Sequence, residues 1–117
     1  MERIERTESL PAEPDEVWAA LTHADRLSEW FGASVVELDV RPGGRLVTRD
    51  EKGIVRRALV EHVEPNERLT FRWLAMEEGP GGEKWPAQAA QVDITLAGTP
   101  EGTDLTVVET PLMLARA

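Results

Sequence analysis

The sequence predicts an α+β domain in which a curved antiparallel sheet of about seven strands packs against two short helices. Helical apolar spacing is confined to residues 14–31. After Gly32, apolar and polar residues alternate with a period of two, and short stretches rich in Gly, Pro and acidic residues separate these segments. Strands of this kind form an antiparallel sheet with one dry face, and that face needs a cover.

The first strand is predicted over residues 3–10, where Ile4 and Leu10 share one side. Glu5 and Thr7 lie on the other side, so this strand has a polar face. Pro14 follows and suits the first position of a helix, where its missing N–H needs no partner.

Two short helices are predicted between the first and second strands. A buried stripe follows from the helical spacing of Val17, Ala20, Leu21 and Ala24. Thr22, followed three residues later by Asp25, resembles a capping box and predicts a break and a second helix. Gly32 is expected to end that second helix.

The rest of the chain predicts six strands in a meander. Turns are expected at residues 41–44, 50–53, 64–67 and 99–102. The longest strand is predicted over residues 54–63. Residues 76–88 are irregular and glycine-rich, and two interpretations stay open: a lid over a pocket mouth or a flexible hairpin loop.

Composition narrows the class of protein. The chain has 117 residues, 41% hydrophobic and 30% charged, which predicts a single globular domain over residues 1–117. Its net charge of −9 disfavours nucleic acid and anionic membranes as partners. The charged segment 1–10 is no signal peptide, and no apolar run is long enough for a membrane helix. We therefore expect a cytoplasmic protein.

The predicted strand 54–63 carries a charged pair whose position has two interpretations. If Arg57, Leu59 and Glu61 face inward, both charges lie in the interior, where unpaired charges are costly and often functional. If a bulge flips the strand, both charges are solvated, and Ile54, Ala58 and Val60 face inward instead.

Aromatic residues suggest a pocket on the same dry face. Trp30, Phe71 and Trp73 either line a pocket for an apolar or aromatic ligand or form plain core. The predicted pocket lining joins them with further residues of that face, namely Leu46, Arg57, Leu59, Glu61, Ile94 and Val107.

No catalytic residue, metal or cofactor is predicted. The chain has no cysteine, and its two histidines, His23 and His62, lie far apart in the sequence. No pattern aims a nucleophile or carboxylate at either imidazole, so both are interpreted as surface or capping residues.

Several local motifs in this order resemble the START-like (SRPBCC) superfamily with the helix-grip fold. They are VWAALTHADRLSEWF at 17–31, the PGG turn at 42–44 and VEHVEPNERLTFRW at 60–73. The nearest subgroup is similar to the activator of the heat-shock ninety chaperone ATPase. The resemblance implies a helix-grip-like curved sheet, and in members a long C-terminal helix usually lies in the grip. This chain ends eight residues after Glu109 with Pro111 among them, so we expect that helix to be absent or very short.

Three functional hypotheses follow from the resemblance. The first is a binding module for an apolar or aromatic small molecule, without catalysis. The second is a co-chaperone-like protein that interacts with a heat-shock chaperone. The third is an enzyme of the polyketide cyclase or aromatase sort, with Arg57 and Glu61 as candidates. An uncovered apolar sheet face further predicts a homodimer.

Overall fold

The structure, a computed structural model, describes residues 2–112. The chain begins with a strand and two helices, β1 (Ile4–Leu10), α1 (Pro14–Leu21) and α2 (Ala24–Phe31). The strands that follow are β2 (Ser34–Leu38), β3 (Arg45–Arg49), β4 (Val55–Glu64), β5 (Arg68–Glu78), β6 (Lys84–Pro86), β7 (Ala90–Thr99) and β8 (Gly102–Pro111).

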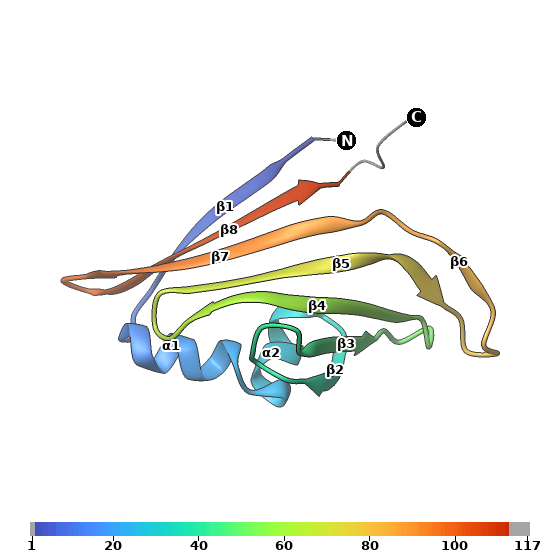
Figure 1. The fold of residues 1–117 in the computed structure, drawn as a ribbon. Helices are drawn as coiled ribbons and strands as arrows, with labels where there is room; N and C mark the ends of the chain where they lie inside the picture. The colour runs from blue at the N-terminus through green and yellow to red at the C-terminus, as the bar shows by residue number, and fades with distance from the viewer. Residues whose placement is uncertain (1, 113–117) are drawn as a thin grey trace.

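The eight strands of residues 2–112 form one antiparallel sheet in the order β1-β8-β7-β5-β4-β3-β2, with β6 paired to β5 alone. The sheet is curved and open, and both helices lie on its inner side (Figure 1). The predicted α+β fold is confirmed, although the strand number is eight rather than about seven because β6 forms within the stretch expected to be irregular. No helix of residues 2–112 is long and apolar enough to cross a membrane.

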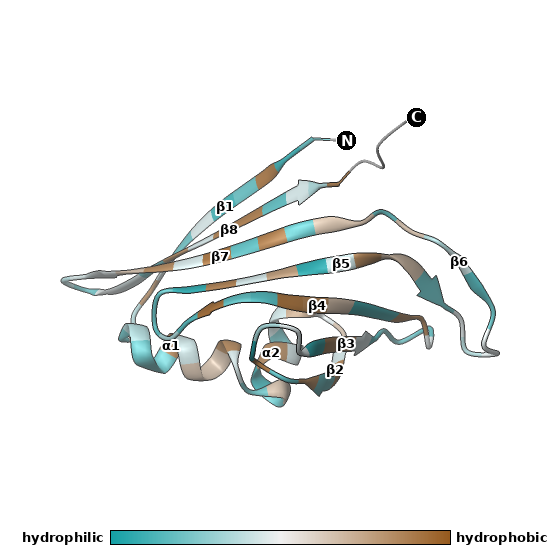
Figure 2. Cartoon of the chain, viewed as in Figure 1, coloured by the Kyte–Doolittle hydropathy of each residue, from teal (hydrophilic) through white to brown (hydrophobic). Residues whose placement is uncertain are grey.

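Alternation along the strands builds the core, as the banded hydropathy in Figure 2 shows. On β7, Val92, Ile94 and Leu96 are buried, while the residues between them are partly or fully exposed. The inner faces of β3, β4, β5 and β8 continue this core with Leu46, Ala58, Val60, Leu69, Phe71, Trp73 and Leu105. Burial of apolar surface at about 25 cal/mol per Å² is the main force that holds the helices to the sheet.

The helix boundaries follow the prediction, but one cap does not. Pro14 begins α1, and Gly32 ends α2 in the left-handed conformation with φ 64°. The expected capping box is wrong, because Thr22 is the C-cap of α1 and its hydroxyl donates to the Trp18 carbonyl at 2.9 Å. His23 is the N-cap of α2 and makes no side-chain capping bond.

Register shifts decide the face of β4. They lie between Arg56 and Ala58 and between Val60 and His62. Ala58 and Val60 are buried, whereas Arg57 and Glu61 are exposed. The inward interpretation of Arg57, Leu59 and Glu61 is therefore wrong. The bulged alternative is observed for Ala58 and Val60, whereas Ile54 precedes β4 and is only partly buried.

Residues 76–88 form a strand extension and a hairpin. β5 runs on to Glu78, and the Met76–Glu78 segment pairs with β6. The Trp85 indole N–H donates to the Glu77 carboxylate at 3.1 Å and fastens the two strands. The lid interpretation is wrong, since the segment extends the sheet itself. Residues 113–117, on which the prediction of an absent or very short C-terminal helix falls, lie outside the described residues.

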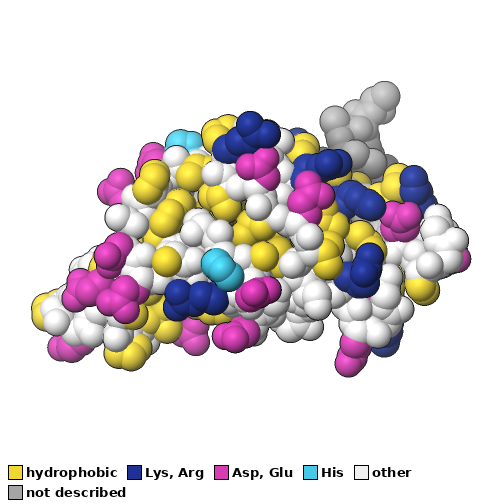
Figure 3. Space-filling model, turned by 90° about the horizontal axis from the view of Figure 1, so that it is seen from below, with side chains coloured by type: hydrophobic (Ala, Val, Ile, Leu, Met, Phe, Trp, Pro, Cys, Tyr) yellow, Lys and Arg dark blue, Asp and Glu magenta, His cyan; other side chains and the backbone are white. Residues whose placement is uncertain are grey.

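Charge is unevenly distributed over the helix side of the molecule. Most Lys and Arg side chains in that view gather toward the end with the β3–β4 turn, and acidic ones crowd the opposite end near α1 (Figure 3). Several of the arginines pair locally, such as Arg45 with Glu37 at 3.2 Å and Arg57 with Glu78 at 2.9 Å. These pairs are partly or fully exposed, so each contributes little to stability.

Candidate ligand-binding cleft

A cleft of about 900 Å³ lies between α2 and the part of the sheet formed by β1, β8 and β7. Its floor is apolar and comes from the inner faces of β7 and β8, through Val92, Ile94, Leu105 and Val107. Leu21 and Leu27 of the helices close its inner end. The four strand residues point into the cleft together because alternate positions of a strand share one face.

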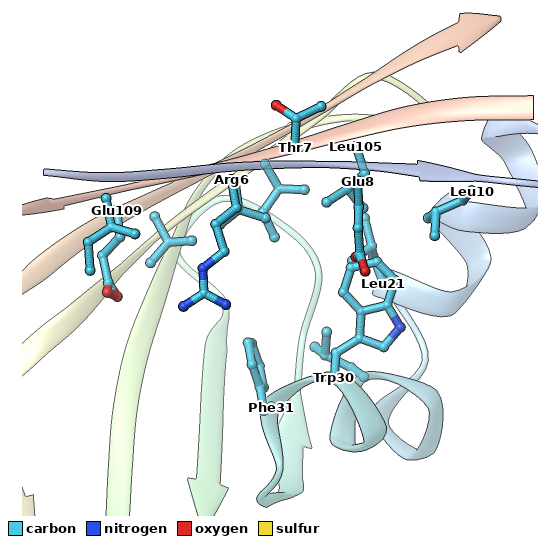
Figure 4. A pocket seen from close by; sticks show the side chains of 14 residues that line it. Arg6, Thr7, Glu8, Leu10, Leu21, Trp30, Phe31, Leu105 and Glu109 are labelled. Atoms are coloured by element: carbon cyan, nitrogen blue, oxygen red, sulfur yellow. The ribbon is translucent and has the colours of Figure 1, made fainter.

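Two consecutive aromatic residues at the end of α2 form the opposite wall (Figure 4). The ring of Phe31 is held in edge contact with Phe71 and Trp73, at centroid distances of 6.2 and 6.0 Å. Trp30 also lines the cleft and is 39% exposed. One aromatic side chain is therefore anchored in the core, and its neighbour is available to a bound molecule.

Among the described residues, three ionisable side chains line the cleft: Arg6 and Glu8 of β1, and Glu109 of β8. Arg6 pairs across the ladder with Val107, and Ile4 pairs with Glu109, which makes Arg6 and Glu109 diagonal neighbours. Within residues 2–112 no carboxylate oxygen lies within 4 Å of the Arg6 guanidinium, since no ion pair of Arg6 is found there. The arrangement can hold an apolar body and form hydrogen bonds to a polar end.

Sequence reasoning missed these three residues, although a signal for them was present. The alternation that places Ile4 and Leu10 on one side of β1 places Arg6 and Glu8 on that same side. Glu109 likewise shares its parity with Leu105 and Val107. A charged residue within an apolar face is the signal, and it was overlooked because the whole strand is polar.

The residues predicted to line a pocket divide into three groups. Trp30, Ile94 and Val107 line the cleft. Leu46, Phe71 and Trp73 are buried in the core, with Phe71 and Trp73 directly behind Phe31. The remaining residues, Arg57, Leu59 and Glu61, lie outside both the core cluster and the cleft.

A second group of polar and aromatic side chains occupies the other end of the inner face. The Arg56 guanidinium carbon lies 4.4 Å from the centroid of Trp73, and its Nε lies 3.3 Å from a Glu77 carboxylate oxygen. The indole of Trp85 donates to the other oxygen of that carboxylate. The cation is paired and stacked here, so this group stabilises the sheet end and offers no free charge.

No histidine of residues 2–112 lines the cleft. His62 lies at the surface with its Nε2 2.8 Å from a Glu64 oxygen. No group of three or more acidic or histidine side chains in residues 2–112 could hold a metal ion.

The family described as "Activator of Hsp90 ATPase homolog 1-like protein" matches residues 11–116. The chain belongs to this family. The match covers both helices and nearly the whole sheet, and it supports assignment of this family member to the START-like superfamily. No protein with a curated description matches the chain.

Solved structures share the fold of this family member. DynU16, from the dynemicin biosynthetic locus, is 32% identical with a TM-score of 0.74, over 93% of this chain and 37% of DynU16. MLL2253 of Mesorhizobium loti is 23% identical with a TM-score of 0.77, over 96% of this chain and 78% of that protein. Mll3558 of Rhizobium loti is 26% identical with a TM-score of 0.70, over 94% and 76%. The chain thus spans well under half of the length of DynU16.

Proposed function

We propose that this protein binds an apolar or aromatic small molecule in the cleft between α2 and the sheet. The observation that carries the proposal is a cleft of about 900 Å³ with an apolar floor and few polar groups. Ligand sites in proteins typically have volumes of about 300–1,000 Å³ and this kind of lining.

The walls of the cleft provide the driving force for binding. Trp30 and Ile4 are 39% and 49% exposed, so a flat apolar molecule between α2 and β1 would remove their surface from water. Each Å² of apolar surface buried contributes about 25 cal/mol, against which the loss of ligand freedom has to be set. Phe31 needs no reordering, because its ring is already held by Phe71 and Trp73.

Thermal unfolding in the presence of a library of hydrophobic compounds tests this proposal. A ligand that binds only the folded state, present at 100 times its Kd, raises the free energy of unfolding by about 2.7 kcal/mol. W30A should reduce the shift, because it removes one of the two aromatic side chains that form the α2 wall of the cleft. M76A is the matched control, since Met76 is 52% exposed and does not line the cleft. Failure of every compound to shift the parent protein would contradict the proposal.

An enzyme of the polyketide cyclase or aromatase sort is the second candidate. Two observations favour it: the Arg6, Glu8 and Glu109 side chains in the cleft, and the 32% identity to DynU16, a protein from a biosynthetic locus. In such an enzyme these groups would orient a bound chain and move its protons. R6M and E109Q should then abolish turnover of a substrate that still binds, whereas retained turnover in both variants would exclude this role.

The family description also names a chaperone ATPase activator, which keeps the co-chaperone hypothesis open. It predicts that the protein co-purifies with a heat-shock chaperone and alters its ATPase turnover. Unchanged turnover at saturating protein, together with no co-purification, would contradict it.

A further inference from the structure

We infer that the cleft selects an uncharged ligand with a hydrogen-bonding end over a carboxylate of the same shape, through Arg6 flanked by Glu8 and Glu109. The inference rests on the small-molecule binding proposed above and names the chemical class of the ligand. It concerns only the three ionisable side chains that line the cleft.

The three side chains form one strip across the β1–β8 ladder. Figure 4 shows the Arg6 guanidinium between the carboxylates of Glu8 and Glu109, with all three directed to the side on which Trp30 and Phe31 lie. Glu8 is two positions along β1 from Arg6, and Glu109 is its diagonal neighbour on β8. Both spacings correspond to about 7 Å between side-chain bases.

The net charge of this strip is negative, with one cation and two anions. A ligand carboxylate in contact with Arg6, at about 3 Å, would lie roughly 6–7 Å from each flanking carboxylate. Coulomb energy falls with distance, so each repulsion is roughly half of the attraction, and the two together nearly cancel it. Arg6 and Glu8 are exposed and Glu109 is partly buried, so an anionic end loses only part of its hydration at the strip, but it gains little electrostatic energy in return.

An uncharged polar end avoids this cancellation. A carbonyl oxygen can accept from the Arg6 guanidinium, while an N–H or O–H beside it donates to Glu8 or Glu109. The apolar body then lies on Val92, Ile94 and Val107 and against the aromatic residues of α2. An aromatic primary amide or hydroxy ketone satisfies all of these groups together.

The test uses three probes with one bicyclic body: 2-naphthamide, 2-naphthoate and 2-methylnaphthalene. The amide and the carboxylate have the same shape and differ in charge. Calorimetry at pH 7 should find 2-naphthamide bound about tenfold more tightly than either of the others, the size of a hydrogen bond to a charged group.

Two variants separate the effect of the two carboxylates from that of the Arg6 guanidinium. E8Q/E109Q keeps the side-chain size and removes both negative charges, so the Kd of 2-naphthoate should fall about tenfold while that of 2-naphthamide changes less than about threefold. R6M should weaken 2-naphthamide about tenfold and leave 2-methylnaphthalene unchanged. E61Q/E67Q is the matched control, because it removes the same net charge at exposed positions that do not line the cleft. It should leave the ratio of amide to carboxylate affinity unchanged.

The results that overturn the inference differ from those that overturn ligand binding itself. The polar strip does not select the ligand if 2-naphthoate binds the parent as tightly as 2-naphthamide, or if R6M weakens the binding of all three probes alike. In either case, binding of 2-methylnaphthalene would still support the proposed function. If none of the three probes binds, the inference is overturned as well, and the hydrophobic library alone decides the proposed function.

Discussion

The Asp93 carboxylate accepts hydrogen bonds from two side chains of the neighbouring strand, Arg68 and Thr70. Arg68 Nε donates to its Oδ1 at 2.8 Å, and the buried Thr70 hydroxyl donates to the same oxygen at 2.8 Å. Partial burial by itself raises the pKa of Asp93, but the hydrogen bonds from Arg68 and Thr70 outweigh this and hold the pKa below its ordinary value. Thr70 of β5 pairs directly with Asp93 of β7, and Arg68, which pairs with Thr95, is the diagonal neighbour of Asp93, so the network joins these two adjacent strands.

We predict that this network makes stability depend on acid pH. A carboxyl group whose pKa is depressed by folding contributes stability above its unfolded pKa, about 4, and loses it as the pH falls through the folded value. D93N should therefore lower the free energy of unfolding by about 1 kcal/mol at pH 7 and flatten its decline below about pH 4. Urea titrations from pH 7 to pH 2 measure this.

The control for D93N is D39N, because Asp39 pairs with Arg41 only at the exposed surface. It should change stability by less than about 0.5 kcal/mol at any pH. Equal pH profiles for D93N and the parent would contradict the prediction.

Aromatic residues that looked equivalent in the sequence differ in the structure. Phe71 is 2% exposed and in contact with Phe31 and Trp73, whereas Trp30 is 39% exposed. We predict that F71A lowers the free energy of unfolding by roughly 3–5 kcal/mol, because it removes a buried ring and leaves a cavity. W30A should cost about 1 kcal/mol or less. Denaturant unfolding compares the two, and an equal loss would show that Trp30 belongs to the core.

At the level of elements, the junction of β1, α1 and β8 depends on one glycine. Gly102 begins β8 with φ 150°, and a Cβ there would overlap the carbonyl oxygen of Leu10 at the end of β1. Next to it, the buried Thr103 hydroxyl donates to the Ala12 carbonyl at 2.7 Å. These contacts fix the direction in which the chain leaves β1 for the helices.

We predict that G102A destabilises the protein by roughly 3 kcal/mol or more, since it adds a clash with backbone to an unfavourable φ. G82A is the matched control: its φ is 87°, but nothing lies within 4 Å of a Cβ built there. It should cost about 1 kcal/mol. Hydrogen exchange should also show faster opening of β1 in G102A, and equal losses in the two variants would contradict this account.

The same elements show what could be predicted from the sequence. The helices, their break near Thr22, the end at Gly32 and the meander were predictable, because each depends on local periodicity and turn residues. The bulges of β4 were not, since a register shift reverses a strand face without leaving a mark in the alternation. The β5–β6 pairing was not predicted, because β6 has only three residues and the Gly and Pro residues at 79–82, directly before it, indicate a loop.

At the level of the whole molecule, the cleft arises from the order of the strands. β1 is distant from β7 in sequence but joins it through β8, so its inner face closes one side of an apolar hollow. α2 forms the opposite wall. It packs against β2, and its last residue, Phe31, is held in edge contact with Phe71 of β5. The candidate site could therefore be predicted only in part: its β7 and β8 floor follows from alternation, whereas Arg6 and Glu8 depend on which strand β1 pairs with.

The homodimer stays a prediction at this scale. Ile4 of β1 and Trp30 of α2 both line the cleft and are 49% and 39% exposed, and monomers rarely expose contiguous apolar patches of more than a few hundred Å². A second copy could cover these residues in a two-fold symmetric contact, in which each copy presents the same surface.

Light scattering over a range of concentrations should then give twice the chain mass for the parent. I4E should weaken self-association about tenfold or more, because it places a charge in the contact, while M76E, at the far end of β5, should not. A monomer at high concentration would contradict the prediction and leave the cleft mouth open to solvent and ligand.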